Sequence, residues 1–140
     1  MAINDYGKQH IPMKFTWEMT ERCNLNCKMC YSIDKNSCNK KEMSTEEIFK
    51  MLKILESNNV LYLFLDGGEP LLRKDFFEIL PEVTKRFCTW ISTNGTLINA
   101  QVAKKLKENN VNTVFVSLHG SNAEIHEKIT QTNGFFMACT

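Results

Sequence analysis

Residues 60–68 read Val-Leu-Tyr-Leu-Phe-Leu-Asp-Gly-Gly, and this stretch decides the fold. Its first six residues form an apolar run without a polar interruption. A run of this length and composition is typical of a strand that is buried on both faces, as in parallel sheets. The two glycines permit a sharp turn directly after the run. The stretch therefore predicts a strand of a parallel sheet that ends in a tight loop.

Strands and helices are expected to alternate on both sides of this run. Residues 13–20 alternate between apolar and polar side chains, which predicts a strand with one polar face. The capping box Ser44-Thr-Glu-Glu47 opens a helix that ends at Asn58-Asn59. The remaining expected elements are a helix over 75–87 that Pro81 kinks or splits, a strand over 88–92, a helix over 99–108, a strand over 113–118 and a final helix that opens with the capping box Ser121-Asn-Ala-Glu124.

This βαβαβαβα order predicts an α/β protein with parallel βα repeats and right-handed crossovers. The sheet could be open and doubly wound or curved toward a TIM-type barrel. A full barrel of eight units takes roughly 250 residues, so these 140 residues hold about half of one. We expect an N-terminal extension over 1–12 and one core domain over 13–140, truncated after about four βα units.

Composition narrows the classes of function. The chain is 43% hydrophobic and 24% charged, with a formal net charge of +1, which is typical of a globular domain. This balance favours neither a nucleic-acid partner nor an anionic membrane surface. The sequence contains no signal peptide and no apolar run of membrane-spanning length, so we expect a cytoplasmic protein. In that reducing compartment, six cysteines indicate free thiols and metal ligands.

Three of the cysteines are closely spaced in Cys23-Asn-Leu-Asn-Cys27-Lys-Met-Cys30. Three thiolates leave one position of a four-ligand site open, and an iron–sulfur cluster with one open iron fits this pattern best. A redox dithiol of Cys27 and Cys30 is one alternative, but it leaves Cys23 without a role. A structural zinc site that recruits Cys38 is another. Cys88 is expected to be a small buried residue, and Cys139 lies too near the end of the chain to form a further motif.

The other unusual residues also follow expected strands. These are Gly67-Gly-Glu-Pro70, Thr93-Asn-Gly95, Ser117 and His119-Gly120. Because the carboxyl ends of parallel strands meet at one rim, four loops would converge there with the cysteines. Each motif alone has a simpler interpretation as a turn or a loop at the end of a strand. Their convergence favours a functional site, where Glu69 could meet a cationic group such as an amine.

These motifs together resemble the radical S-adenosylmethionine superfamily, in particular its peptide- and protein-modifying enzymes with a SPASM or twitch extension. The resemblance runs from about Pro12 to Phe136 and rests on Cys23–Tyr31, Gly-Gly-Glu-Pro at 67–70, Ser-Thr-Asn-Gly at 92–95 and Val-Ser-Leu-His-Gly at 116–120. It implies a partial (βα)6 barrel, a [4Fe–4S] cluster and S-adenosylmethionine. It also implies reductive cleavage of S-adenosylmethionine and hydrogen abstraction from a peptide or protein substrate. A flavodoxin or ferredoxin would supply the electron, and the cluster and cofactor would carry the chemistry without further catalytic residues.

The resemblance assigns roles residue by residue. Cys23, Cys27 and Cys30 would ligate the cluster. The set expected to bind S-adenosylmethionine is Gly67, Gly68 and Glu69 at the methionine amino group, Met29 near the adenine in place of the usual aromatic residue, and Ser117 and Asn94 near the ribose. Thr130 stands where many relatives carry an arginine for the cofactor carboxylate, so another residue, such as Lys128, would have to supply that charge. His119 is expected to be a loop residue, and an inactive cluster-binding fragment is an alternative to an active enzyme.

Overall fold

The computed structural model describes residues 13–31, 42–133 and 139. Four strands alternate with four helices and one short 3-10 helix. The elements are β1 (Lys14–Glu18), α1 (Thr45–Ser57), β2 (Tyr62–Asp66), η2 (Pro70–Leu72), α2 (Phe76–Thr84), β3 (Cys88–Thr93), α3 (Ala100–Glu108), β4 (Thr113–Val116) and α4 (Ala123–Thr130). Within these residues, no helix has both the length and the apolar character needed to cross a bilayer.

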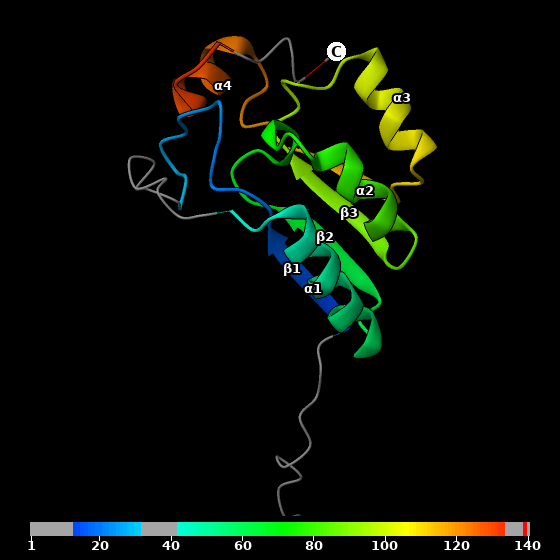
Figure 1. Cartoon of the computed structure of the whole chain (residues 1–140). Helices are drawn as coiled ribbons and strands as arrows, with labels where there is room; N and C mark the ends of the chain where they lie inside the picture. Colours follow the sequence, from blue (N-terminus) through cyan, green and yellow to red (C-terminus); the bar gives the residue numbers. More distant parts are fainter. Residues whose placement is uncertain (1–12, 32–41, 134–138, 140) are drawn as a thin grey trace, which may run out of the picture.

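The four strands form one parallel sheet in the order β1-β2-β3-β4, so each strand pairs with the next one in the chain (Figure 1). Trp17 pairs with Leu65, Leu65 with Ile91, and Ile91 with Val114. The predicted parallel βα fold, equivalent to part of a TIM-type barrel, is confirmed. Because every strand runs in the same direction, all four carboxyl ends lie along one edge of the sheet.

Helices α1, α2 and α3 cover one face of the sheet (Figure 1). The core between them and the strands is apolar and largely inaccessible to water. Its buried members from the strands include Trp17, Leu63, Leu65 and Ile91, and those from the helices include Ile48, Leu52, Phe76, Ile79, Leu80, Val83 and Leu106. Burying these side chains provides the main stabilisation of the fold.

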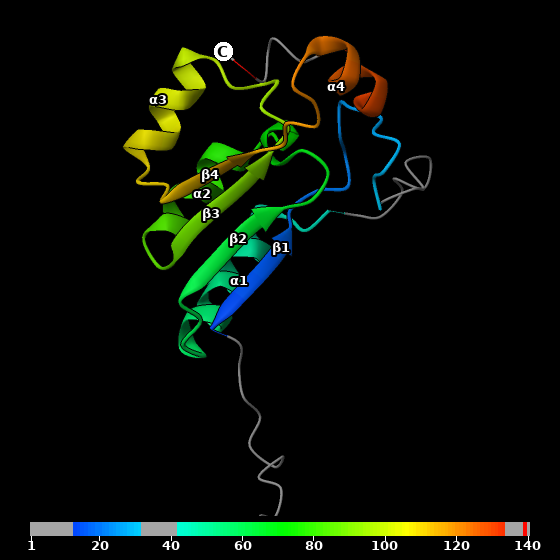
Figure 2. The same ribbon diagram turned by 180° about the vertical axis from the view of Figure 1, so that it is seen from behind.

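No described helix covers the opposite face of the sheet, which Figure 2 shows from behind. Four aromatic side chains, Tyr62, Phe64, Trp90 and Phe115, contact one another there, with ring centroids 5.6 to 6.3 Å apart. The Lys14 ammonium lies 4.9 Å from the Trp90 centroid. The prediction that residues 60–65 are buried on both faces is therefore wrong for the described chain, where Tyr62 is 37% exposed.

Two helix predictions also need correction. Of the kink or split predicted at Pro81, the split is wrong, because α2 continues through Pro81, and α2 runs from Phe76 to Thr84 rather than over 75–87. The side chain that caps α4 is Asn122 rather than Ser121, because its oxygen accepts the Ile125 N–H. Asn and Ser are both good N-caps, so adjacent candidates could not be ranked from sequence. By contrast, the predicted Ser44–Glu47 capping box is confirmed at α1.

Candidate metal and cofactor site

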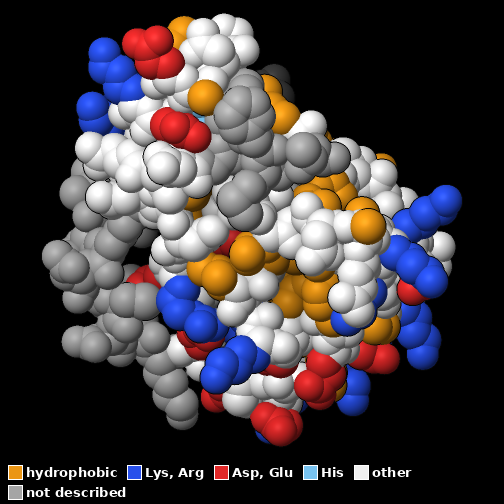
Figure 3. All heavy atoms as spheres, turned by 90° about the horizontal axis from the view of Figure 1, so that it is seen from above, with side chains coloured by type: hydrophobic (Ala, Val, Ile, Leu, Met, Phe, Trp, Pro, Cys, Tyr) orange, Lys and Arg blue, Asp and Glu red, His pale blue; other side chains and the backbone are white. Residues whose placement is uncertain are grey.

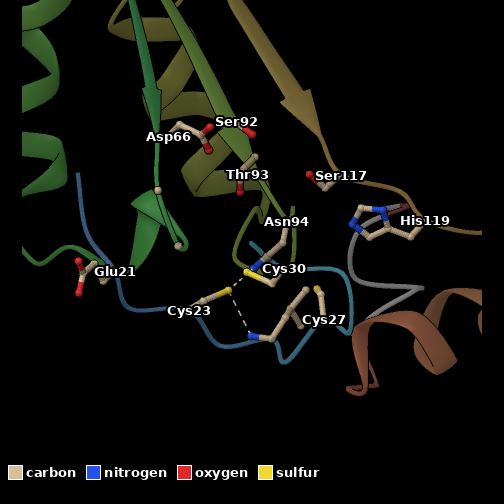
Figure 4. Close-up of a pocket in the computed structure, with 13 residues that line it drawn as sticks. Glu21, Cys23, Cys27, Cys30, Asp66, Ser92, Thr93, Asn94, Ser117 and His119 are labelled. Atoms are coloured by element: carbon tan, nitrogen blue, oxygen red, sulfur yellow. Dashed lines mark hydrogen bonds between the residues drawn. The ribbon is translucent and has the colours of Figure 1, made fainter. Parts of the chain in front are cut away.

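A cavity lies at the carboxyl ends of the strands, and all three cysteines of the predicted cluster loop line it (Figure 4). The loop after β1 contributes five residues to the lining: Glu21, Cys23, Leu25, Cys27 and Cys30. The end of β2 and the turn after it contribute Asp66, Gly67 and Gly68. The end of β3 and the loop after it contribute Ser92, Thr93 and Asn94, and the loop after β4 contributes Ser117 and His119. Four separate loops therefore meet at one site. Seen from above, hydrophobic side chains gather at the middle of the molecule and charged side chains lie around its edge (Figure 3).

The cysteine loop is fastened to the end of α4. The Lys28 N–H donates to the Ile129 carbonyl at 2.9 Å, and the Asn26 N–H donates to the Thr130 carbonyl at 3.1 Å. The Cys30 N–H closes a tight turn onto the Cys27 carbonyl at 3.2 Å. These bonds use carbonyls that the last turn of a helix leaves without intrahelical partners. The backbone is thereby held by hydrogen bonds on both sides of Cys27, at Asn26 and at Lys28.

The glycine turn after β2 contacts the chain segment that leads into the cysteine loop. The Gly68 N–H donates to the Thr20 carbonyl at 2.7 Å, and the Glu69 N–H donates to the Arg22 carbonyl at 2.7 Å. Gly67 has φ of +130°. A Cβ on Gly68 would lie 2.2 Å from the Arg22 oxygen. Glycine is therefore required here by close backbone approach as well as by conformation.

Glu69 is fully buried, and its carboxylate faces the loop after β3. It accepts hydrogen bonds from the Thr93 hydroxyl at 2.8 Å, the Asn94 N–H at 2.7 Å and the Leu71 N–H at 3.1 Å. Burial raises the pKa of Glu69, although these donors oppose the shift. The carboxylate thus joins the loops after β2 and β3, and it is absent from the residues that line the cavity.

A buried guanidinium braces the start of the cysteine loop. Arg73 donates to the Met19 carbonyl at 2.9 Å, to the Met43 carbonyl at 2.7 Å and to the Asp75 carboxylate at 2.8 and 2.9 Å. Beside it, Glu42 accepts from Arg22 at 3.0 Å and from the Thr20 hydroxyl. Burial acts to raise the pKa of Glu42, but these hydrogen bonds and the two arginines hold it below its ordinary value. The network ties β1 to the segments before α1 and α2.

His119 lies at the rim after β4, where Figure 4 shows its ring near Ser117. Its ring stacks on that of the buried His126 with centroids 5.9 Å apart, and its backbone N–H donates to Nδ1 of His126 at 3.2 Å. Burial and the neighbouring histidine lower the pKa of His119, which favours the neutral ring. The rim therefore places the His119 imidazole beside Ser117.

The structure brings most of the predicted site residues to the cavity and leaves two outside its lining. Those that line it are Cys23, Cys27, Cys30, Gly67, Gly68, Asn94 and Ser117. Met29 is 57% exposed and Glu69 is turned toward β3, so neither is among the lining residues. Cys88 is half-buried and Cys139 is exposed, whereas Cys38 lies outside the described residues.

Sequence reasoning missed four lining residues: Glu21 and Leu25, which lie in the loop after β1, and a second pair, Asp66 and Ser92. Both belong to the uncovered face of the sheet, at the ends of β2 and β3. Strict alternation places Tyr62, Phe64 and Asp66 on one face of β2, and this phase could have identified Asp66. The signal was hidden because the residues between them are also apolar.

The donor set suits an iron–sulfur cluster. Within the described residues, no three His, Cys, Asp or Glu side chains are placed to hold a single metal ion. A cubane cluster makes a different demand, because its cysteines bind different irons and need not converge on one atom. Three partly exposed thiols around a cavity whose lining also includes Gly67 and Gly68 fit such a group.

Comparison with known families identifies the class. The family model of the Radical SAM superfamily matches residues 17–137. The chain therefore belongs to the radical SAM superfamily, whose cofactors are a [4Fe–4S] cluster and S-adenosylmethionine. This membership confirms the resemblance on which the cofactor predictions rest.

Curated relatives with similar sequences are named as enzymes. The mycofactocin maturase MftC of Mycolicibacterium smegmatis is 36% identical over 128 residues, which cover 91% of this chain and 32% of the relative. The Fe-coproporphyrin III synthase of Methanosarcina barkeri is 41% identical over 123 residues, covering 87% of this chain and 31% of the relative. The chain thus spans about a third of the length of these curated relatives.

Solved structures agree on the fold. Native anSMEcpe with bound AdoMet superposes with a TM-score of 0.73 at 27% identity, covering 89% of this chain and 38% of that one. Streptococcus suis SuiB bound to its precursor peptide SuiA gives a TM-score of 0.76 at 21% identity, covering 87% of this chain and 28% of that one. The second likeness shows the fold alone.

Proposed function

We propose that residues 13–140 form the cluster- and cofactor-binding core of a radical S-adenosylmethionine enzyme. The observation that carries this proposal is the meeting of Cys23, Cys27 and Cys30 with the Gly67-Gly68 turn around one cavity. When bound, the cluster and cofactor supply reductive cleavage of S-adenosylmethionine and a radical that abstracts hydrogen from substrate. The protein binds the cluster, orients the cofactor and limits access of water.

Each residue has a proposed task. The three thiolates hold the cluster, and the backbone of Gly67 and Gly68 binds the methionine part of the cofactor. Ser117 and Asn94 also line the cavity and are the proposed contacts of the ribose. Met29 and Glu69 have less geometric support, because one is exposed and the other uses its carboxylate within the rim. The cofactor carboxylate would need a cation such as Lys128, which is exposed on α4 and is not among the residues that line the cavity.

A peptide or protein is the proposed substrate. One relative is named a maturase, and one similar structure contains a precursor peptide, which supports a peptide substrate. Other relatives are named a synthase and a cyclase, so a small molecule is the competing class of substrate. A flavodoxin or ferredoxin is the proposed electron donor, with a SPASM or twitch extension as the proposed neighbour in the whole enzyme. The reducing cytoplasm is the proposed location, since it preserves free thiols.

Anaerobic reconstitution with iron and sulfide tests the cluster. We expect about four irons and four sulfides per chain, as one cubane requires. Replacing Cys23, Cys27 and Cys30 together by Ala should abolish iron binding. Cys88→Ala is the matched control, because Cys88 lies at the opposite end of β3 from the cavity. A native chain that binds no iron, or a triple variant that retains it, would contradict the proposal.

Two further measurements separate binding from turnover. Adding S-adenosylmethionine should change the electron paramagnetic resonance spectrum of the reduced cluster, because the cofactor binds the iron that lacks a protein ligand. Release of 5′-deoxyadenosine after reduction would indicate catalysis by this chain. Cluster formation without 5′-deoxyadenosine would instead favour the inactive cluster-binding alternative. One zinc that depends on Cys38 would favour the structural zinc site.

A further inference from the structure

The side-chain amide of Asn94 points at the sulfur of Cys23. Asn94 directly follows β3 and is 8% exposed. Its Nδ2 lies 3.9 Å from Sγ of Cys23, and the Leu25 N–H lies 3.4 Å from the same sulfur. Figure 4 draws both contacts as dashed lines. One cysteine of the loop therefore receives two N–H groups, of which one comes from a distant strand.

A closed ring of hydrogen bonds fixes which end of the Asn94 amide faces the sulfur. Its Oδ1 accepts from the Thr96 backbone N–H at 2.9 Å and from the Thr96 hydroxyl at 2.7 Å. Its Nδ2 donates to Oδ1 of Asn24 at 2.8 Å, and the Asn24 amide donates back to the Thr96 hydroxyl at 2.8 Å. A backbone N–H can only donate, so the oxygen must face Thr96. The NH2 group is thus the end nearest Cys23.

Hydrogen bonds to the sulfurs of an iron–sulfur site favour the more negative, reduced state and raise the reduction potential. The Asn94 amide supplies such a donor without adding a net charge, and its burial limits competition from water. We propose that Asn94 is a positioning residue that raises the reduction potential of the cluster through Cys23. This inference rests on the proposed ligation of the cluster by Cys23. It assigns Asn94 a role toward the cluster that differs from the ribose contact expected from the sequence.

A redox titration of the reconstituted chain, followed by electron paramagnetic resonance, tests the role. For Asn94→Ala we expect the equilibrium constant for one-electron reduction to fall about tenfold, which corresponds to a potential about 59 mV lower. Asn94→Asp preserves the shape but exchanges the donor for a charged acceptor, so its potential should fall further. Asn109→Ala is the matched control, because the Asn109 amide caps α3 at the Lys105 carbonyl. Its potential should equal that of the native chain.

The potential separates this role from a purely structural one. A structural Asn94 would change the amount of cluster or the stability of the chain, while the clusters that form would keep the native potential. Native-like potentials in both Asn94 variants would therefore overturn the inference. Absence of any cluster in the native chain would instead overturn the proposed function itself.

A second measurement is decided on the native chain, with one variant as a control. Native chain labelled with ¹⁵N only in asparagine side-chain amides should show a ¹⁵N hyperfine coupling to the reduced cluster. Asn24→Ala removes the other labelled amide of the ring and should preserve the coupling, because Asn94 still carries its donor. No coupling in the native chain would overturn the inference, whatever the variants do.

Discussion

The backbone N–H of Lys28 donates a 2.9 Å hydrogen bond to the carbonyl oxygen of Ile129, so the middle of the cysteine loop is joined to the last turn of α4. Asn26 makes the neighbouring bond to Thr130. Figure 1 shows α4 beside the loop and away from the three helices that cover the sheet. The shape of the candidate cluster site therefore depends on the last described helix of the chain.

Weakening α4 should loosen the cysteine loop. Asn122→Ala removes the N-cap bond to Ile125 and should cost about 1 kcal/mol of helix stability. Hydrogen exchange at the Asn26 and Lys28 amides should then become faster. Asn99→Ala is the matched control, because it removes the equivalent cap from α3, at Val102. Equal exchange of the two loop amides in both variants would show that α4 does not hold the loop.

A methyl group on Gly68 should displace the entry to the cysteine loop. Its Cβ would lie 2.2 Å from the Arg22 oxygen and 2.6 Å from the Arg22 carbonyl carbon, and both are backbone atoms that cannot rotate away. We expect Gly68→Ala to lower the free energy of unfolding by about 1–3 kcal/mol. Iron content after reconstitution should fall as well, because Cys23 directly follows Arg22 and would move with its carbonyl group. Native iron content and native urea midpoint together would contradict this account of the turn.

Removing the Arg73 guanidinium should be far more costly than removing Arg86, whose partners are exposed carboxylates. Arg73→Ala leaves the carbonyls of Met19 and Met43 and the Asp75 carboxylate without their donor, and we expect a loss of about 3 kcal/mol. Arg86→Ala is the control, because Arg86 pairs with the exposed Glu56 and Glu82. Such a pair is worth about 1 kcal/mol or less. Urea denaturation of both variants measures the difference, and similar losses would refute it.

Glu69 should make stability fall as pH rises. Burial raises its pKa in the folded chain above the ordinary value of 4.5, so the folded state binds the proton more tightly than the unfolded state. The resulting stabilisation is complete below pH 4.5 and is lost as the pH rises through the folded pKa. Glu69→Gln should remove this slope from a plot of unfolding free energy against pH. Glu108→Gln, on the exposed side of α3, should leave the slope unchanged.

Much of the fold could be predicted from local patterns. Strand and helix order followed from apolar periodicity, and the Ser44 cap followed from its spacing to Glu47. The exceptions have local causes too: Ser121 and Asn122 are both good caps, and the short helix Pro70–Leu72 offers too few residues for a periodic signal.

For the candidate site, the sequence predicted which residues meet but not how each side chain is directed. The spacing of Cys23, Cys27 and Cys30 and the place of the glycine pair after a strand were sufficient to predict that these residues meet at one edge of the sheet. The direction of Glu69 could not be predicted, because a buried carboxylate turns toward whichever donors surround it, here Thr93 and Asn94. Asp66 was hidden for a related reason, since strand phase identifies a face but not the cavity beyond it.

The sequence by itself was sufficient to predict features that depend on neighbouring residues. These are three thiols within one loop, two glycines after a strand, and the alternating elements of a parallel sheet. Relationships between distant segments emerged with folding, since packing alone brings Asn94 to Cys23, α4 to Lys28 and Arg73 to Met19. The physical reason is range. Thiol chemistry and backbone conformation are properties of single residues and their neighbours, whereas hydrogen bonds across loops exist only where burial of the core has already set the distance.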